Sequence, residues 1–134
     1  MSEDEKLIQA ARSHQGEFSL SEPWLTAGSV SSALVTESGN IYTGICLDMA
    51  CGIGFCAEHS AVAAMLLNRE TVIRKIVAVD SERILPPCGR CRELILQVDC
   101  RNRECLVMLP SGSVIRLIEL MPHPWMECEV EEIH

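Results

Sequence analysis

The spacing of hydrophobic and polar positions in the first half of the chain predicts a helix followed by two strands. Residues 4–15 carry apolar side chains at helical spacing, whereas residues 16–28 are rich in Gly, Ser and Pro and are typical of a loop. Residues 30–36 and 41–46 have the β-branched, alternating pattern of strands. Ser38, Gly39 and Asn40 between them are turn residues, so the two strands are predicted to form a hairpin.

The second half continues with alternating helices and strands. An Ala-, Leu- and Met-rich stretch over residues 56–68 predicts a helix, and the β-branched run over residues 72–80 predicts a buried strand. A second helix is expected over residues 88–98 and a further strand over residues 105–109, before a short mixed end. Strands alternating with helices predict an α/β fold in which a layered sheet is covered by helices.

Length and charge narrow the possible functions. A chain of 134 residues with 48% hydrophobic and 22% charged residues is expected to form one globular domain, residues 1–134. The net charge of −8 favours neither a nucleic acid polymer nor an anionic membrane as partner. No apolar run is long enough to span a membrane, and the first residues lack the pattern of a signal peptide, so a cytoplasmic location is expected. Acidic residues 127–132 are expected to form a solvated end.

Eight cysteines are unusual in a chain of this size. A reducing cytoplasm keeps thiols free, so disulfides are not expected and the cysteines should serve as metal ligands or as small buried hydrophobic groups. Four of them lie outside any recognisable motif and are predicted to be buried or half-buried thiols: Cys46, Cys100, Cys105 and Cys128.

Three other cysteines have the spacing of a metal site. Cys88 and Cys91 lie three residues apart in the first turn of a predicted helix, so their sulfur atoms can converge on one ion. Cys56 opens the preceding predicted helix, where the positive end of the helix dipole stabilises a thiolate. Three protein ligands leave a fourth tetrahedral position open, which is typical of a catalytic zinc site.

Glu58 follows Cys56 by two residues and can stand beside the metal without binding it. A carboxylate in that place can act as a general base and then as a general acid. The alternative is a structural zinc site with Cys51 or His59 as a fourth ligand, or two unconnected thiol pairs. Such a site would leave Glu58 without a purpose.

These motifs resemble a known family. Cys56-Ala57-Glu58, followed by Pro87-Cys88-Gly89-Arg90-Cys91, resembles the zinc signature of the cytidine deaminase superfamily. The all-cysteine form is similar to the small nucleoside deaminases, which include cytidine deaminase and blasticidin-S deaminase. The predicted hairpin also looks like the family's first hairpin, and Glu119 to Pro122 with Trp125 resembles the C-terminal end of the blasticidin-S type.

The resemblance implies a three-layer fold, with a five-stranded mixed sheet flanked by helices. It implies that Cys56, Cys88 and Cys91 hold one Zn²⁺ per chain and that Glu58 shuttles the proton. The Ala57 backbone would contact the polar edge of the pyrimidine, zinc hydroxide would attack the amine-bearing ring carbon, and ammonia would leave. Family members of this length are usually homotetramers, and the simplest assignment is to pyrimidine salvage.

The chain departs from the family where the sugar is bound. The family's Gly-x-Asn-x-Glu matches Gly44 to Asp48, so Cys46 replaces the amide and Asp48 replaces the longer acid. An aromatic residue near the family's first strand falls at Gly28 here. We therefore predict that Cys46 and Asp48 contact the substrate but bind its sugar differently from the family's residues. For this reason cytidine itself is expected to be a modest substrate.

Several alternatives stay open at this stage. Cys51 is expected to pack or to contact substrate, His59 to contact a thiolate or to lie on the surface, and Trp125 to lie in an interface, the core or the pocket wall. The function is expected to be deamination of a free nucleoside or related base, with a blasticidin-S-type resistance deaminase or a zinc-stabilised binding module as alternatives. A polynucleotide-editing deaminase is disfavoured by the net charge and by the 4% aromatic content.

Overall fold

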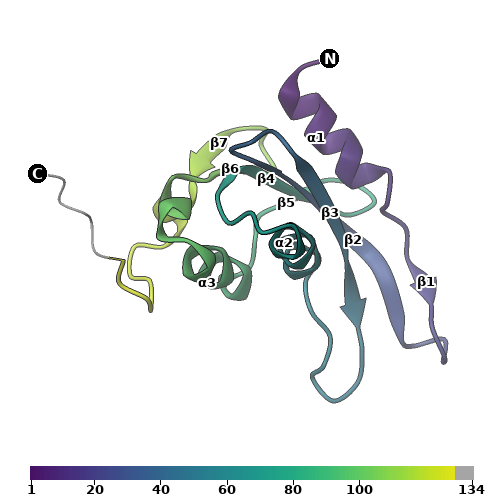
Figure 1. Cartoon of the computed structure of the whole chain (residues 1–134). Coiled ribbons are helices and arrows are strands. Elements are labelled where there is room, and N and C mark those ends of the chain that lie inside the picture. Colours follow the sequence, from purple (N-terminus) through teal and green to yellow (C-terminus); the bar gives the residue numbers. More distant parts are fainter. Residues whose placement is uncertain (129–134) are drawn as a thin grey trace, which may run out of the picture.

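The computed structural model describes residues 1–128, so residues 129–132 of the predicted acidic end lie outside the described part. Helices and strands alternate along the chain as the sequence predicts (Figure 1). The α-helices are α1 (Glu3–Arg12), α2 (Ala57–Leu67) and α3 (Gly89–Val98), and the short 3₁₀ helices are η1 (Cys100–Glu104) and η2 (Leu117–Leu120). The strands are β1 (Phe18–Ser19), β2 (Thr26–Thr36), β3 (Ile41–Asp48), β4 (Ile73–Val79), β5 (Ile84–Leu85), β6 (Leu106–Met108) and β7 (Val114–Arg116).

The sheet is mixed and is built around β2. This strand pairs antiparallel with β3 and with β4, β4 pairs parallel with β6, and β6 pairs antiparallel with β7. The prediction of a mixed sheet is confirmed, but the sheet has seven strands rather than the predicted five. Two strands of two residues each extend it: β1 pairs with the beginning of β2, and β5 pairs with the end of β4. Both β1 and the first residues of β2 lie in the stretch predicted to be a loop.

Helices cover both faces of the sheet, which gives three layers (Figure 1). Alternating residues of β2 point to opposite faces, so Ala33 and Val35 pack with Leu7 and Ala11 of α1. Leu34, between them, belongs to the second apolar cluster, on the face covered by α2 and α3. The helix residues of this second cluster are Ala61, Val62, Met65, Ile95 and Leu96. The α/β fold class is therefore confirmed.

Helix α2 lies directly on β3 because β3 carries a glycine at the contact. A Cβ atom at Gly44 would stand 2.3 Å from the amide nitrogen of Ala61 and 2.5 Å from Cβ of Ser60. Any side chain at position 44 would push the helix away from the sheet. Since Cys56 and Glu58 are at the beginning of α2, this close contact helps to set the position of the candidate site.

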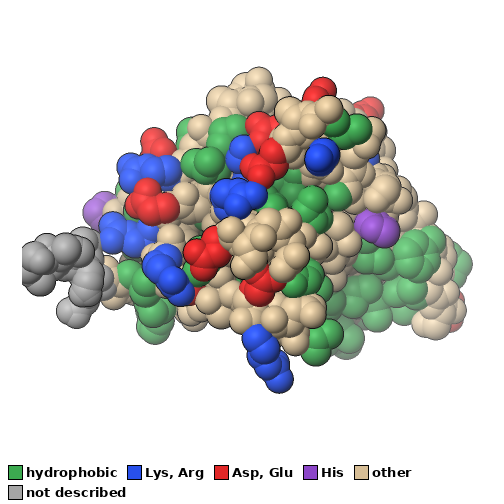
Figure 2. All heavy atoms as spheres, turned by 45° about the horizontal axis from the view of Figure 1, so that its top comes forward, with side chains coloured by type: hydrophobic (Ala, Val, Ile, Leu, Met, Phe, Trp, Pro, Cys, Tyr) green, Lys and Arg blue, Asp and Glu red, His purple; other side chains and the backbone are tan. Residues whose placement is uncertain are grey.

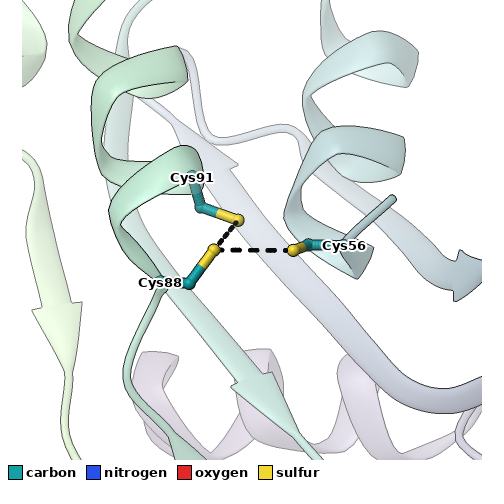
Figure 3. A group of neighbouring side chains, drawn as sticks. All are labelled: Cys56, Cys88 and Cys91. Atoms are coloured by element: carbon teal, nitrogen blue, oxygen red, sulfur yellow. Dashed lines mark hydrogen bonds between the residues drawn. The ribbon is translucent and has the colours of Figure 1, made fainter. Parts of the chain in front are cut away.

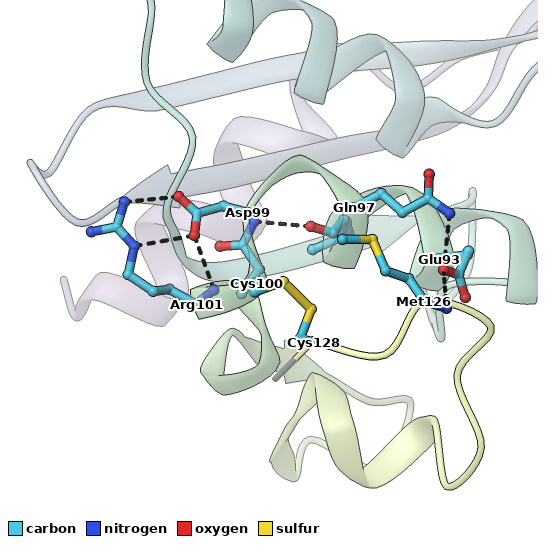
Figure 4. Close-up of a disulfide and its surroundings, with 9 residues drawn as sticks. Glu93, Gln97, Asp99, Cys100, Arg101, Met126 and Cys128 are labelled. Carbon is cyan, nitrogen blue, oxygen red and sulfur yellow. Dashed lines mark hydrogen bonds and ion pairs between the residues drawn. A yellow bond between two sulfur atoms is a disulfide. The ribbon is translucent and has the colours of Figure 1, made fainter. Parts of the chain in front are cut away.

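The expectation that Cys100 and Cys128 are thiols is wrong. Their sulfur atoms are bonded at 2.07 Å, with Cα atoms 5.7 Å apart (Figure 4). The bond ties the C-terminal segment to η1. The same segment is held to α3 by Glu93, whose carboxylate accepts hydrogen bonds from the amides of Trp125 and Met126 at 3.2 Å each. This packing brings together two cysteines that are 28 residues apart in the sequence, and a general preference of the compartment for free thiols does not depend on such tertiary contacts.

The disulfide gives a stability prediction. Closing a loop of 28 residues lowers the entropy of the unfolded chain, which in the chain-entropy account stabilises the fold by about 3–4 kcal/mol. We therefore expect Cys100→Ser with Cys128→Ser to lower the melting temperature by roughly 5–15 °C, measured by calorimetry on protein of equal metal content. Cys51→Ser, which removes an exposed thiol, is the control. An unchanged melting temperature in the double variant would show that the bond does not stabilise the native chain.

Charges of both signs are mixed on the face of the molecule that Figure 2 views. No helix among residues 1–128 is long and apolar enough to cross a membrane. Figure 2 shows Lys and Arg side chains interspersed with Asp and Glu on the face that it views, without a continuous basic stripe. On this face the surface therefore lacks the basic patch that binding of a nucleic acid polymer favours.

Candidate metal centre and active site

The N-termini of α2 and α3 meet and bring three cysteines together. Cys56 is the N-cap of α2, Cys88 is the N-cap of α3, and Cys91 lies in the first turn of α3. Their sulfur atoms point toward one another (Figure 3) and all lie within 4.8 Å of each other. The structure thus assembles the three cysteines that the sequence predicts as metal ligands, and within residues 1–128 it shows no other such group of three or more metal-binding side chains.

The spacing of the sulfur atoms fits a tetrahedral zinc ion. With Zn–S bonds of about 2.3 Å, two ligands at the tetrahedral angle have sulfur atoms about 3.8 Å apart. The Sγ atoms of Cys56 and Cys88 are 3.6 Å apart, and so are those of Cys88 and Cys91. These distances would change by only tenths of an ångström on binding the ion.

The three thiols differ in how readily they ionise. Burial raises the pKa of Cys56 and of Cys91, and at Cys91 the charge of Glu58 raises it further. Burial alone would raise the pKa of Cys88 too, but hydrogen bonds from the amides of Cys91 and Arg90 and from the neighbouring thiols lower it overall. Because Cys56 and Cys91 hold their protons more tightly than an ordinary thiol, binding of a divalent cation to this group is expected to release protons.

Glu58 lies beside this group and is almost fully buried. Its residue is 5% exposed, it lies in the first turn of α2, and burial raises the pKa of its carboxyl group. The carboxylate is not one of the three grouped ligands, yet the residue lines the same pocket as Cys56 and Cys88. This is the placement expected of a proton carrier beside a metal rather than of a ligand.

Neither residue considered as a fourth ligand belongs to the group of sulfur atoms. His59 Nδ1 lies 3.7 Å from the Sγ atom of Cys91, which places His59 in contact with one of the three grouped thiols rather than on the open surface. Cys51 is exposed, with a positive φ of 62°, and is not among the residues that line the pocket. The expectation that Cys51 packs or touches substrate is therefore not met in this chain.

Cys56 and Cys88 open onto a pocket of about 660 Å³, which is large enough for a nucleoside-sized molecule. Its walls come from the ends of β2 and β3, the loop between β3 and α2, the short strand β5, and the starts of α2 and α3. The residues that line it include Trp24, Ser29, Cys46, Asp48, Cys56, Ala57, Glu58, Cys88 and Arg90.

All three residues predicted to contact substrate line this pocket. Ala57 is fully buried at the start of α2, Cys46 is 5% exposed on β3, and Asp48 is exposed at the end of β3. Ser29, which the sequence analysis did not single out, joins two of them: its Oγ atom lies 3.3 Å from Cys46 Sγ and 3.4 Å from Asp48 Oδ2. The irregularity in the β2–β3 pairing between Ala27 and Ser31 obscures this position in the alternating pattern.

The backbone explains why no aromatic residue stands at position 28. Gly28 has a φ of +87°, and a Cβ atom there would lie 2.4 Å from the carbonyl oxygen of Gly16. Trp24, in the turn between β1 and β2, instead contributes an aromatic ring to the pocket wall. Trp125 is 82% exposed and lies neither in the core nor in the wall of this pocket.

Two arginines lie near the site: Arg92 is held by backbone carbonyl groups, whereas Arg90 is exposed at the pocket wall. Arg92 donates to the carbonyl oxygens of Pro87 at 2.9 Å and Leu120 at 3.0 Å, so it ties the entry of α3 to the C-terminal segment. Arg90 is exposed at the pocket wall between the two α3 cysteines. Together with burial, its charge lowers the pKa of His59, which places Arg90 at the thiol end of the pocket.

Comparison with known proteins decides the family. The chain is 32% identical to a cytidine deaminase of Halalkalibacterium halodurans, over 69% of this chain and 74% of that protein. The chain belongs to the cytidine deaminase family. Membership makes it a hydrolytic deaminase, although no family model matches the sequence.

Further matches support the same family assignment. The chain is 29% identical to a blasticidin-S deaminase of Bacillus cereus, over 69% of this chain and 74% of that protein. The crystal structure of cytidine deaminase from Mycobacterium leprae superposes with a TM-score of 0.76 at 25% identity, over 92% of this chain and all of that one. The cytidine deaminase of Mycobacterium tuberculosis has the same fold, with a TM-score of 0.79 at 24% identity, over 95% of this chain and all of that one.

Proposed function

We propose that this deaminase is zinc-dependent and acts on a cytidine-like nucleoside or a related amino-pyrimidine, with release of ammonia. One observation carries the proposal. A buried acid, Glu58, lines the same 660 Å³ pocket as two members of a three-sulfur group with zinc spacing. A zinc-stabilised binding module would need neither an open ligand position nor a buried acid beside it.

Each residue has a defined task in this proposal. Cys56, Cys88 and Cys91 hold one Zn²⁺ per chain, which when bound supplies the Lewis acidity that lets water act as a nucleophile near neutral pH. Glu58 accepts a proton from the attacking water and delivers it to the departing amine, so one carboxylate serves both transfers. The Ala57 backbone, at the start of α2, faces the polar edge of the ring. The two helix N-termini, together with the charge of Arg90 at the pocket wall, offset the negative charge that three thiolates leave on the site.

A panel of substrates tests the proposed function. Purified, zinc-loaded protein is incubated separately with cytidine, deoxycytidine, cytosine, blasticidin S, guanine and adenosine, and ammonia release is measured. We expect release from at least one of the cytosine-containing compounds. Release from guanine or adenosine alone would contradict the pyrimidine assignment.

A blasticidin-S-type resistance or detoxification deaminase is the second candidate. It is favoured by the similarity to a relative of that name and by the altered residues on the sugar side of the pocket. If cytidine is instead the efficient substrate, the simpler assignment to pyrimidine salvage follows.

The sugar-side residues give a quantitative prediction. Cys46 replaces an amide and Asp48 replaces a longer acid, and a thiol is only a weak hydrogen-bonding group. Each lost hydrogen bond to a buried partner costs about 1–3 kcal/mol, which corresponds to a roughly 5–150-fold loss of specificity. We therefore expect Cys46→Asn with Asp48→Glu to raise kcat/KM for cytidine by about tenfold or more. The two single variants are the controls. If wild type already turns over cytidine as well as the double variant, the two substitutions do not set substrate scope.

We also propose that the protein forms a homo-oligomer in which each subunit binds a small molecule. Its resemblance to the family suggests a tetramer. An exposed Trp125, at 82%, supports an interface on the C-terminal segment. Sedimentation at several protein concentrations, for wild type and Trp125→Ala, measures the assembly directly. A wild-type monomer at all concentrations would contradict it.

A further inference from the structure

Arg92 holds the backbone on both sides of Cys88. Its main-chain amide donates to the carbonyl oxygen of Cys88 at 3.0 Å, and its side-chain Nε donates to the carbonyl oxygen of Pro87 at 2.9 Å. These carbonyl groups belong to the two rigid peptide planes that flank the Cα atom of Cys88. The orientations of the two planes set φ and ψ of Cys88, and hence the direction in which its Cβ and Sγ atoms leave the backbone.

The start of α3 needs such a contact because its N-cap is a cysteine. Ser, Thr, Asp or Asn usually fixes this position through its side chain. The Cys88 sulfur is instead directed at the other two thiols, 3.6 Å from each (Figure 3). Pro87 is buried and precedes the helix, so its carbonyl group lies outside the regular helical pairing. The Arg92 side chain supplies a donor to that carbonyl group.

The same guanidinium is fixed at its other end to a distant part of the chain. Its Nη1 donates to the carbonyl oxygen of Leu120 at 3.0 Å. Leu120 ends η2 and packs against the apolar cluster on the face covered by α2 and α3. Because the guanidinium is planar and its donors have fixed directions, Arg92 braces the turn before Cys88 against a packed segment.

We propose that Arg92 is a positioning residue for the metal centre, which holds Cys88 Sγ at the distance from the other two sulfur atoms that zinc requires. Arg92 is not among the residues that line the pocket, so it acts through Cys88 and not on the substrate. Residues that orient metal ligands typically contribute about 10–100-fold to metal affinity or activity. This role rests on the proposed function, because it takes the three sulfur atoms to bind zinc.

Zinc affinity tests the role of Arg92. The dissociation constant of zinc is measured on the full chain by competition with a chromogenic chelator, for wild type, Arg92→Gln and Arg92→Lys. We expect both variants to bind zinc about 10-fold or more weakly, because neither new side chain has the planar fork that bonds both carbonyl groups. With Co²⁺ in place of zinc, the visible absorption bands, which depend on ligand geometry, should change in both variants. At saturating zinc, kcat should fall while KM changes little.

Glu93→Gln is the matched control. Glu93 is the next residue of α3, and its carboxylate accepts hydrogen bonds from the amides of Trp125 and Met126, so it ties the same C-terminal segment to the same helix. This variant should lower the melting temperature but keep the zinc affinity and the Co²⁺ spectrum of wild type. Arg12→Gln, on the exposed side of α1, controls for the loss of one positive charge and should also bind zinc as wild type does.

Three results would overturn the role of Arg92. Its two variants bind zinc as tightly as wild type, or Glu93→Gln weakens zinc binding equally, or Arg92→Lys restores the affinity that Arg92→Gln loses. The second would make Arg92 a general tie of the C-terminal segment, and the third would assign the effect to charge rather than to position. Should Arg92→Gln not fold, the comparison of Arg92→Lys with Glu93→Gln decides.

Failure of the proposed function is a different outcome. In that case wild type binds zinc but releases no ammonia from any compound of the panel. The zinc affinities and Co²⁺ spectra still decide the role of Arg92, since neither measurement depends on turnover.

Discussion

Glu58→Gln is expected to retain zinc and fold but to lose turnover by at least about 10²–10⁴-fold, the range typical of an acid/base residue. Glutamine has nearly the shape of glutamate, so it fits the buried position at the start of α2, but its amide cannot accept and return a proton. The loss should lie at the upper end of the range or beyond, because one carboxylate serves both proton transfers. Ammonia release and zinc content are measured on the same preparation.

Glu37→Gln is the matched control for this loss. It makes the same chemical change on an exposed residue in the hairpin turn, far along the sheet from the pocket, and should leave turnover unchanged. If Glu58→Gln keeps near-normal activity with full zinc content, another group carries the proton and the assigned role of Glu58 is wrong.

Cys88→Ser is expected to abolish zinc binding at protein-equivalent concentrations and, with it, all measurable deamination. A hydroxyl is a far weaker ligand for zinc than a thiolate, and Cys88 stands between the other two sulfur atoms at 3.6 Å from each. Metal binding is coupled to folding, so the melting temperature should also fall. Metal analysis after dialysis, together with calorimetry, measures both effects.

Cys51→Ser controls for the loss of a thiol near the pocket. Cys51 lies in the loop between β3 and α2 but outside the sulfur group, so this variant should keep one zinc per chain. A Cys88→Ser protein that still binds one zinc per chain with wild-type affinity would refute the assigned ligand set.

The predictable part of the fold is the part with strong local periodicity. The helix over residues 56–68 and the strand over residues 72–80 match α2 and β4 to within one residue at each end. The two-residue strand β1 could not be predicted, because it is defined by its pairing with β2 and not by its own sequence. For the same reason β2 begins earlier than its β-branched residues indicate.

The three cysteines, Glu58 and the two β3 residues Cys46 and Asp48 could be predicted as parts of the candidate site, whereas Ser29 and Trp24 could not. Cys56, Cys88 and Cys91 have spacings that fix them at helix starts, so helical geometry alone brings two sulfur atoms together. Ser29 and Trp24 reach the pocket through an irregular stretch of β2 and a turn, for which no periodicity applies.

The disulfide was missed for a related reason. Its two cysteines are brought together by the path of the C-terminal segment over α3 and η1, which is set by tertiary contacts such as those of Glu93. A reducing compartment favours free thiols at Cys100 and Cys128, whereas in the folded chain the two are bonded.

Removal and return of the metal tests the account most directly. Zinc is stripped from the purified protein with a chelator and restored in steps, and zinc content and ammonia release from the best substrate of the panel are measured at each step. We predict about one zinc per chain in the untreated protein, loss of activity on stripping, and recovery in proportion to zinc up to one equivalent. A folded protein that deaminates its substrate at full rate without bound metal would contradict the account.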